Sequence, residues 1–392
     1  MAEEAGPSLM QRNMLTGNWG GLRNQLLEKG VKLNLEFTEY YQGMFSGEGN
    51  DDFEFGGRAD ALVDFDTEKL GLWNGGGFHT HLTYRFGEIP VFRGGALWPP
   101  STGSILPLGK EDDVVGTSLY LSQRFGGSAS LILGKINAVD LLANDPFFGG
   151  WGNHRFMNIA LVAPPSGVLP PVIMGAIFNY RIVPYNLTFM VYDPQDRTGD
   201  YWPDGLFSDG VNLSLGGTWA GNLFGRVSSI NLTGIYSTEE KIDLREIALP
   251  PELRTGTKEW AYNISIKVTH LLLESATHPG QGLGFYAKGA VADGNPNPIE
   301  ASLSGGFAGH KLVRGRPSDV FGIGYFYYNF SKDLKSALRP LFNFNDEQGV
   351  EIYYNLAVTP WFRVTADLQW LDPATGSIDD SWVGALRANV RL

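Results

Sequence analysis

The sequence contains no cysteine and no long hydrophobic run. The first absence excludes disulfides, thiolate metal sites and thiol nucleophiles. No stretch of the 392 residues approaches the roughly 20 consecutive apolar residues that a membrane-spanning helix requires, so a helical membrane protein is excluded. Excess basic charge is also lacking: the net charge of −12 argues against a nucleic-acid partner. No signal peptide is evident, and Met1 before Ala2 suggests a start codon added to a mature sequence.

Glycine and aromatic residues are abundant instead. The 51 glycines are nearly twice the usual share of roughly 7%. Aromatic residues make up 13% of the chain, and the mean hydropathy is −0.12. This composition indicates many strands and tight turns. The low hydropathy still permits a membrane barrel, because half of each strand in such a barrel faces water.

The end of the chain shows the pattern most clearly. Apolar residues occupy alternate positions at Phe362, Val364, Ala366, Leu368 and Trp370, and polar residues lie between them at Arg363, Thr365, Asp367 and Gln369. An extended chain has a side-chain period of two, so this stretch is a strand with one apolar and one polar face. In a membrane barrel the apolar face meets lipid and the polar face meets a water-filled lumen.

Similar alternation recurs along the chain and predicts about sixteen strands. They are placed near 31–40, 57–66, 77–86, 115–125, 128–137, 172–181, 185–193, 209–219, 223–236, 258–270, 281–292, 300–309, 319–330, 348–359, 361–371 and 382–392. Their lengths suit tilted membrane strands. Short and long connections alternate, as in outer-membrane barrels with tight periplasmic turns and long outer loops. The sequence therefore predicts an all-β fold, a transmembrane antiparallel barrel of about sixteen strands.

Two segments outside the predicted strands are expected to pack at the ends of the barrel or inside it. Residues 1–30 form a predicted periplasmic segment with a short helix around Leu22 and Leu26 that Gly30 stops, and this is the one place with helical character. Residues 31–392 form the barrel. The third long outer loop, 138–171, has about 34 residues, which is too long for an idle connection. We expect it to fold inward and narrow the pore.

Four motifs carry a resemblance to a known family. They are residues 15–23 (LTGNWGGLR), 133–140 (LGKINAVD), 319–325 (DVFGIGY) and 351–369, which begins with EIYY. Together they resemble the carbohydrate-selective porins of the OprB type, although Lys135 stands where that family usually has Arg and the last residue is Leu392 rather than Phe.

The resemblance implies a channel in the outer membrane of a Gram-negative bacterium that admits monosaccharides such as glucose by passive diffusion. It implies no cofactor and no metal. The expected partners are the sugar, outer-membrane lipid or lipopolysaccharide and the barrel-assembly machinery. The chain is expected to work either as a monomer or as a homotrimer.

A pore that favours a sugar needs groups that hydrogen-bond hydroxyls and aromatic faces for the C–H surface. The predicted inward faces and the long loop supply these candidates for substrate binding or constriction: Arg58, Asp60, His79, His81, Arg85, Lys135, Asp140, Trp151, His154, Arg155, Glu351, Arg363, Asp367 and Gln369. Arg85, Lys135 and Trp151 are the preferred solute contacts. For any single candidate the competing interpretation, favoured for most of them, is a hydrated lattice of ion pairs that stiffens the wall.

Other interpretations of the sequence stay open. His79 and His81 share a face at a spacing that can hold a metal, but no third ligand is evident nearby, so hydrogen bonding to the wall is the favoured role. A general or carboxylate-selective porin is the main alternative function. A barrel enzyme, such as a lipase or glycosidase, and a soluble β-rich binding protein are weaker alternatives, because no Ser–His pair is apparent and because the strand pattern fits lipid contact.

Overall fold

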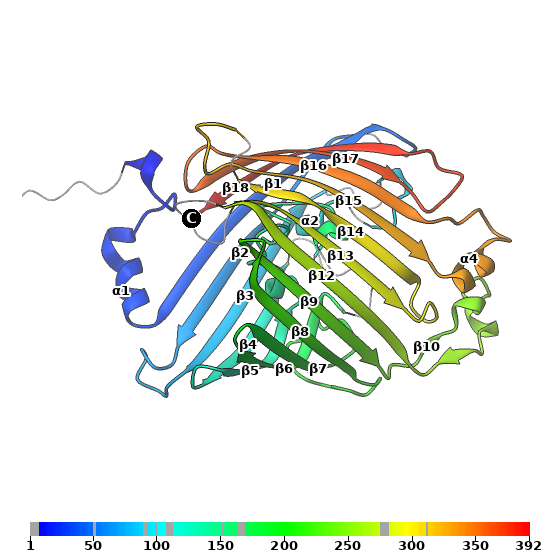
Figure 1. Cartoon of the computed structure of the whole chain (residues 1–392), viewed down its shortest axis with the longest axis horizontal. Helices are drawn as coiled ribbons and strands as arrows, with labels where there is room; N and C mark the ends of the chain where they lie inside the picture. The colour runs from blue at the N-terminus through cyan, green and yellow to red at the C-terminus, as the bar shows by residue number, and fades with distance from the viewer. Residues whose placement is uncertain are drawn as a thin grey trace, which may run out of the picture.

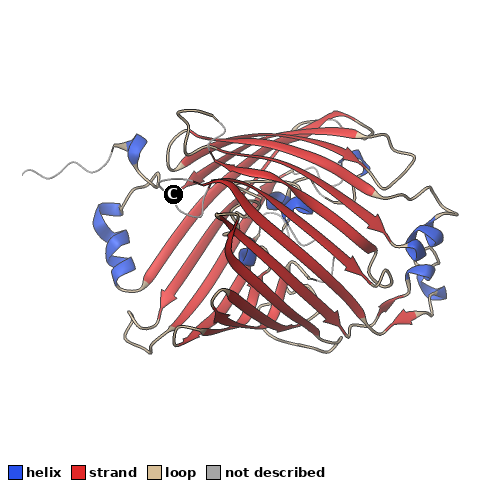
Figure 2. Ribbon diagram, viewed as in Figure 1, coloured by secondary structure: helices blue, strands red, loops and turns tan. Residues whose placement is uncertain are grey.

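The computed structural model describes residues 8–49, 52–88, 93–98, 100–106, 113–150, 152–162, 169–274, 282–310 and 313–392. Sixteen antiparallel strands form a closed barrel, in which β1 pairs with β18 (Figures 1 and 2). The barrel strands are β1 (Val31–Ser46), β2 (Glu54–Asp66), β3 (Gly76–Gly87), β4 (Val114–Phe125), β5 (Ala129–Asn137), β6 (Val172–Ile182), β7 (Tyr185–Tyr192), β8 (Asn212–Leu223), β9 (Arg226–Ser237), β12 (Ala261–Glu274), β13 (Gly282–Ala292), β14 (Ile299–His310), β15 (Val320–Phe330), β16 (Glu347–Ala357), β17 (Phe362–Asp372) and β18 (Ser381–Arg391). The predicted strands are confirmed, although β1 ends at Ser46 rather than at residue 40.

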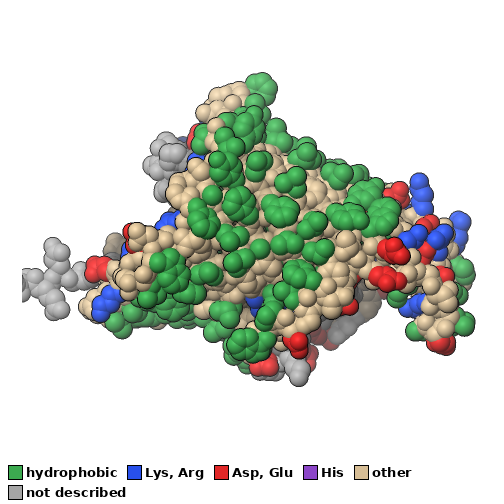
Figure 3. Space-filling model, turned by 90° about the horizontal axis from the view of Figure 1, so that it is seen from below, with side chains coloured by type: hydrophobic (Ala, Val, Ile, Leu, Met, Phe, Trp, Pro, Cys, Tyr) green, Lys and Arg blue, Asp and Glu red, His purple; other side chains and the backbone are tan. Residues whose placement is uncertain are grey.

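Side chains alternate between the two faces of the wall as the sequence pattern predicts. Ile264 and Leu386 are exposed on the outer surface, whereas their neighbours Asn263 and Arg387 are buried on the inner one. Apolar side chains spread over the outer wall, and charged ones lie mainly toward its two ends (Figure 3). This arrangement is inside-out relative to a soluble sheet, because the buried inner face is the polar one.

The two ends of the barrel differ in the length of their connections. One end, called the short-turn end here, carries the connections 126–128, 183–184, 224–225 and 358–361, and the opposite long-loop end carries 88–113, 138–171, 193–211 and 238–260. Helix α1 (Leu22–Glu28), which the sequence predicts, lies at the short-turn end beside the C-terminus (Figure 1). The N-terminal segment is tied there by the main-chain N–H of Leu15, which donates to the oxygen of Arg391 at 2.8 Å.

The expectation that helix occurs only near the N-terminus was wrong. The described residues also form α2 (Thr102–Ile105), α3 (Ile159–Val162) and α4 (Lys332–Leu338), a small sheet of β10 (Lys241–Ile242) and β11 (Thr257–Lys258), and the 3-10 turns Leu9–Gln11, Trp19–Gly21, Arg93–Gly95, Asp140–Leu142, Leu244–Glu246 and Pro251–Leu253. Most of these elements are single turns, too short to leave a periodic signal. Helix α4 is capped by the Ser331 hydroxyl, which accepts from two main-chain N–H groups. None of the helices that the structure describes is long and apolar enough to cross a membrane.

Candidate functional site

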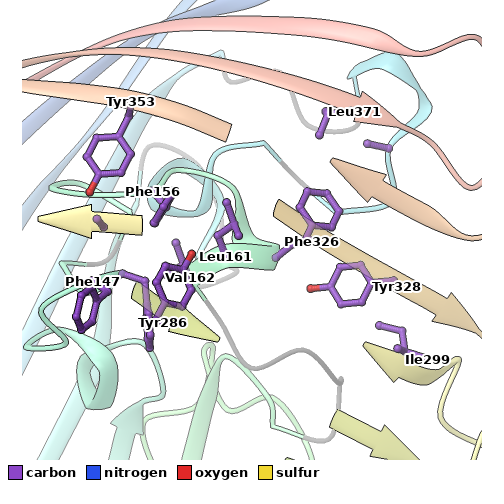
Figure 4. Packing of buried hydrophobic residues seen from close by; sticks show 14 of the residues in the cluster. Phe147, Phe156, Leu161, Val162, Tyr286, Ile299, Phe326, Tyr328, Tyr353 and Leu371 are labelled. Carbon is purple, nitrogen blue, oxygen red and sulfur yellow. The ribbon is translucent and has the colours of Figure 1, made fainter. Parts of the chain in front are cut away.

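An apolar cluster joins the 138–162 segment to the inner wall. From the segment it includes Phe147, Phe148, Phe156, Leu161 and Val162, and from the wall Tyr286, Phe326, Tyr328, Tyr353 and Leu371 (Figure 4). Two glycines of β15 make room for it. A Cβ at Gly324 would lie 2.9 Å from atoms of Phe156 and Leu161, and one at Gly322 would lie 2.9 Å from Phe156. The wall therefore carries no side chain at these two positions, where the segment packs.

Hydrogen bonds from β16 and β17 fix the same segment. The fully buried carboxylate of Glu351 accepts from the main-chain N–H of Met157 at 2.5 Å and of Asn158 at 2.9 Å. The side-chain amide of Asn158 donates to Gln369 at 3.0 Å, and Gln369 in turn donates to Asp367 at 2.9 Å. Three predicted site residues, Glu351, Asp367 and Gln369, thus face inward and hold the segment.

A second set of contacts comes from the closing seam between β1 and β18. The guanidinium of Arg387 donates to the carbonyl oxygens of Gly152 and, at 3.0 Å, of Arg155. The ring of His154 is 3.0 Å from a carboxylate oxygen of Glu36. The guanidinium of Arg387 thus binds backbone carbonyls. Because Arg387 is only 1% exposed, it has little access to solute.

A third network lies between β2 and β3. Arg58 forms a two-pronged pair with Asp60, with Nε 2.7 Å from one carboxylate oxygen. His81 bridges Asp60 and Asp140 at 2.9 Å each. Arg58 and Arg85 each also donate, at 2.8 Å, to a carbonyl oxygen within α2. These five predicted residues brace two loop segments against the wall, which is the structural role that competed with solute contact.

Two other predicted residues lie toward the short-turn end. His79 is 2.8 Å from Asp64 and 2.8 Å from Ser122, so it hydrogen-bonds the wall as favoured above. Arg363 donates to the side-chain oxygen of Asn355 at 2.7 Å. Throughout the described part of the chain, no group of three His, Cys, Asp or Glu residues is arranged to hold a metal ion.

The assignment of Lys135 to the lumen was wrong. In the register of β4 and β5, Lys135 lies opposite Leu119, which is exposed on the outer wall. Its ammonium donates to the carbonyl oxygens of Thr198 and Asp200 at 2.8 Å each, outside the barrel. Strand β5 has apolar residues on both faces, so alternation could not tell which face is inner. The third preferred contact, Trp151, lies outside the described residues.

A hollow lies inside the barrel, lined by strands other than those that carry these braces. This hollow, of about 190 Å³ and called the inner hollow here, separates the 138–162 segment from the wall. It is lined by Asn231, Thr233, Asn263, Ser265, Lys267 and Lys288 of β9, β12 and β13, and by Leu141, Leu142 and Phe148 of the segment, among others. None of the predicted candidate residues is among the described residues that line this inner hollow.

The sequence did contain a signal for the inner hollow. Asn263, Ser265 and Lys267 form the polar face of the most regular predicted strand. Their role was missed because every strand offers a polar face, and the sequence does not say which face the loops leave uncovered.

The charge in the inner hollow comes from two lysines that sit opposite each other on β12 and β13. Lys267 pairs with Asp145 at 3.1 Å. Lys288 is buried, donates to the carbonyl oxygen of Leu161 at 2.8 Å and lies 4.1 Å from the centre of the Phe148 ring. The remaining polar lining consists of neutral amides and hydroxyls. Such a surface can hydrogen-bond an uncharged, hydroxyl-rich solute.

Comparisons with known proteins agree with this geometry. Residues 52–392 match the sequence model of the family described as "Carbohydrate-selective porin, OprB family". Porin B of Pseudomonas aeruginosa is 24% identical over 429 aligned positions, which cover 95% of this chain and 90% of that protein. The high-pH structure of Pseudomonas putida OprB superposes with a TM-score of 0.83 at 19% identity, covering 99% of this chain and 100% of the other.

A more distant neighbour shares the fold. The outer-membrane channel DcaP of Acinetobacter baumannii has a TM-score of 0.57 at 10% identity, with 92% of this chain and 97% of that one covered. Families built on this channel fold are in general not enzymes. The chain belongs to the carbohydrate-selective porins of the OprB family and is a sugar-selective porin of the Gram-negative outer membrane.

Proposed function

We propose that monosaccharides of the glucose type diffuse passively through the inner hollow, between the 138–162 segment and β7–β13. The observation that carries this proposal is the division of the inner wall. Charged side chains on β2, β3, β16 and β18 are buried against loop segments. Neutral amides and hydroxyls on β9 and β12 line the hollow.

The chemistry of the lining suits an uncharged ring with hydroxyl groups. Asn231 and Asn263 each offer donors and an acceptor, and the hydroxyls of Thr233 and Ser265 offer both in one atom. The hollow has a volume of about 190 Å³, many times the roughly 10–15 Å³ that a single water requires, so it admits a solute larger than water. Because a channel must release what it binds, a few exchangeable hydrogen bonds are preferable to a tight site.

We further propose that the 138–162 segment is the outer loop that narrows the pore. Its apolar cluster with β13–β17 and its hydrogen bonds to Glu351 and Arg387 support this role. The long-loop end would then face the outside, and the N-terminal 30 residues, at the short-turn end, would face the periplasm.

The test is ion current through single channels in planar bilayers, with and without glucose. The double variant Asn231→Leu, Thr233→Val removes two hydrogen-bonding groups of the hollow. At about 1 kcal/mol each, their loss predicts an apparent glucose affinity lower by roughly tenfold to thirtyfold. Thr188→Val is the matched control, since Thr188 is a partly buried hydroxyl residue of β7 that does not line the hollow.

Two outcomes would contradict the proposal. In the first, high glucose leaves the wild-type current unchanged. In the second, the double variant and Thr188→Val lose the same glucose affinity. Gluconate, which carries a carboxylate, provides the comparison for the alternative selectivity: if it blocks the current more strongly than glucose, a carboxylate channel is favoured.

A further inference from the structure

A second hollow lies on the outer face of the barrel, where lipid is expected. It has a volume of about 580 Å³ and is bounded by β3–β7 and by residues 193–211, called the roof segment here. Its lining is mainly apolar and includes Leu82, Leu119, Leu133, Met174, Trp202 and Phe207. This outer hollow is separate from the inner hollow, because its wall residues point away from the lumen.

The roof segment is held in place by two cations. Lys135 donates to two of its carbonyl oxygens at 2.8 Å each, and its ammonium lies 5.2 Å from the centre of the Tyr201 ring. Arg197 pairs with Asp193 at 2.8 Å and Asp200 at 2.9 Å, and it donates to the carbonyl oxygen of Gly205 at 3.1 Å. These contacts hold the roof segment over the outer face of the wall.

Glycine at position 116 adds no side chain to the floor of the outer hollow. A Cβ there would meet only Tyr201 at 3.5 Å and Leu82 at 3.8 Å, and its backbone does not adopt a positive φ. The main chain therefore does not require glycine at this position. What glycine provides is room for the Tyr201 ring, since a larger side chain would project between the wall and the roof.

The surroundings identify the occupant. Leu119 and Leu133 belong both to the outer hollow and to the exposed apolar band, so the hollow is continuous with the lipid-facing surface of this outer-membrane protein. It lies beneath the roof at the long-loop end, which faces the outer leaflet in the orientation proposed above, and on this point the inference rests on the proposed function. Trp202 is 80% exposed at its rim, and Trp and Tyr favour the level of lipid headgroups.

We infer that the outer hollow binds one acyl chain of an outer-leaflet glycolipid of the lipid A type. A flexible methylene chain fills an irregular apolar recess that opens onto hydrocarbon, and it gains favourable contacts with the roof as well as with the wall. Tyr201 and Trp202 then flank the polar end of the lipid. The roof segment acts as a clamp for lipid in addition to connecting β7 and β8.

Native mass spectrometry of the purified porin, incubated with lipid A in detergent, tests this inference. We expect the wild type to retain one lipid A molecule, and Gly116→Leu, which fills the floor, to retain at least fivefold less. Gly217→Leu is the matched control. It makes the same change on the outer wall, where the nearest atom to its Cβ is Leu187 Cδ2 at 3.8 Å. It should retain lipid A like the wild type.

Thr80→Leu fills the same hollow from β3 and serves if Gly116→Leu does not fold; it should also lose lipid A. Glucose block of the ion current should be unchanged in every variant that folds, which separates this inference from the proposed function. Equal retention by the filled variants and the control would overturn the inference, as would a wild type that retains no lipid. A change of oligomeric mass in the filled variants without loss of lipid would instead assign the hollow to a second copy of the chain.

Discussion

The guanidinium of Arg23 donates two hydrogen bonds, each 3.0 Å long, to the main-chain oxygen of Leu392. The Trp19 ring lies against the same guanidinium, 4.2 Å from its carbon. Leu392 follows β18, whose pairing with β1 closes the barrel, and its own N–H donates to the Leu35 carbonyl at 2.9 Å. Residues 369 positions apart therefore fasten the seam of the barrel from the short-turn end.

Arg23→Ala should weaken this seam. Hydrogen bonds from a charged donor contribute roughly 1.5–3 kcal/mol, and partial exposure of Arg23 favours the lower value. The measurement is the temperature at which the folded, fast-migrating band converts to the unfolded one in gel electrophoresis. Glu28→Ala, at an exposed position of the same helix, is the control. Equal shifts for both variants would show that the contact with Leu392 contributes nothing specific.

The roof segment should depend on pH through Asp193. Burial alone would raise the pKa of this carboxyl, but hydrogen bonds from Arg197 and from the main-chain N–H groups of Phe207 and Gln195 hold the pKa below its ordinary value of roughly 3.9. A depressed folded-state pKa stabilises the fold above the unfolded-state pKa, and the stabilisation disappears as pH falls through the folded-state value.

Asp193→Asn makes this dependence measurable. At pH 7 we expect the variant to unfold at a lower temperature than the wild type, by the equivalent of about 1–3 kcal/mol. The difference should persist to about pH 4 and shrink below it, as the wild-type carboxyl takes up a proton. A difference that stays constant from pH 7 to pH 3 would mean that the Asp193 carboxylate does not hold the roof.

The buried pair of Arg58 and Asp60 permits a sharper test of the braces. Arg58→Met leaves the Asp60 carboxylate buried without its strongest partner, which typically costs 3–5 kcal/mol. It also removes the donor to α2, so single-channel current should become larger or noisier. The double variant Arg58→Met, Asp60→Leu should recover much of the stability, because it leaves no unpaired charge.

Recovery in the double variant is the informative result. A double variant as unstable as Arg58→Met would indicate that the contact to α2, rather than the ion pair, determines stability. Arg124→Met is the control for loss of positive charge, since Arg124 is exposed near the short-turn end.

The strands could be predicted from the sequence because lipid and water impose opposite demands on alternate residues. Strand β12 shows this clearly, with Ile264 and Ile266 outward and Asn263 and Ser265 inward. The rule fails in β5, where Ile132 and Ile136 pack inward beside Tyr192 while Lys135 points outward beneath the roof. Apolar residues lie on both faces of that strand, and its one cation lies on the outer face, so alternation there carries no information on sidedness.

The candidate site was harder to predict for a related reason. The sequence places Arg58, Glu351 and Asn231 alike on inner faces, and the alternation treats them as equivalent. Tertiary contacts with the 102–106 and 138–162 segments cover the first two and leave the third at the inner hollow. Which polar residues line the inner hollow is thus decided by where the loops pack, and the loops lack a periodic pattern.

Removing one or the other charge of the Lys267–Asp145 pair at the inner hollow should change the ion selectivity of the pore in opposite directions. The side chains of Lys267 and Asp145 are 28% and 8% exposed and lie 3.1 Å apart. Each charge largely neutralises the other, and few other charges line the hollow. Lys267→Gln removes one positive charge beside Asp145 and should shift the reversal potential in a KCl gradient toward cation selectivity. Asp145→Asn should shift it toward anions, because it removes the negative charge that is paired with Lys267. Lys241→Gln, in the connection between β9 and β12 at the long-loop end, removes the same charge outside the hollow and should change the potential little. If both pair variants shift the potential in the same direction, or neither differs from Lys241→Gln, ions do not pass this pair and the path through the inner hollow is wrong.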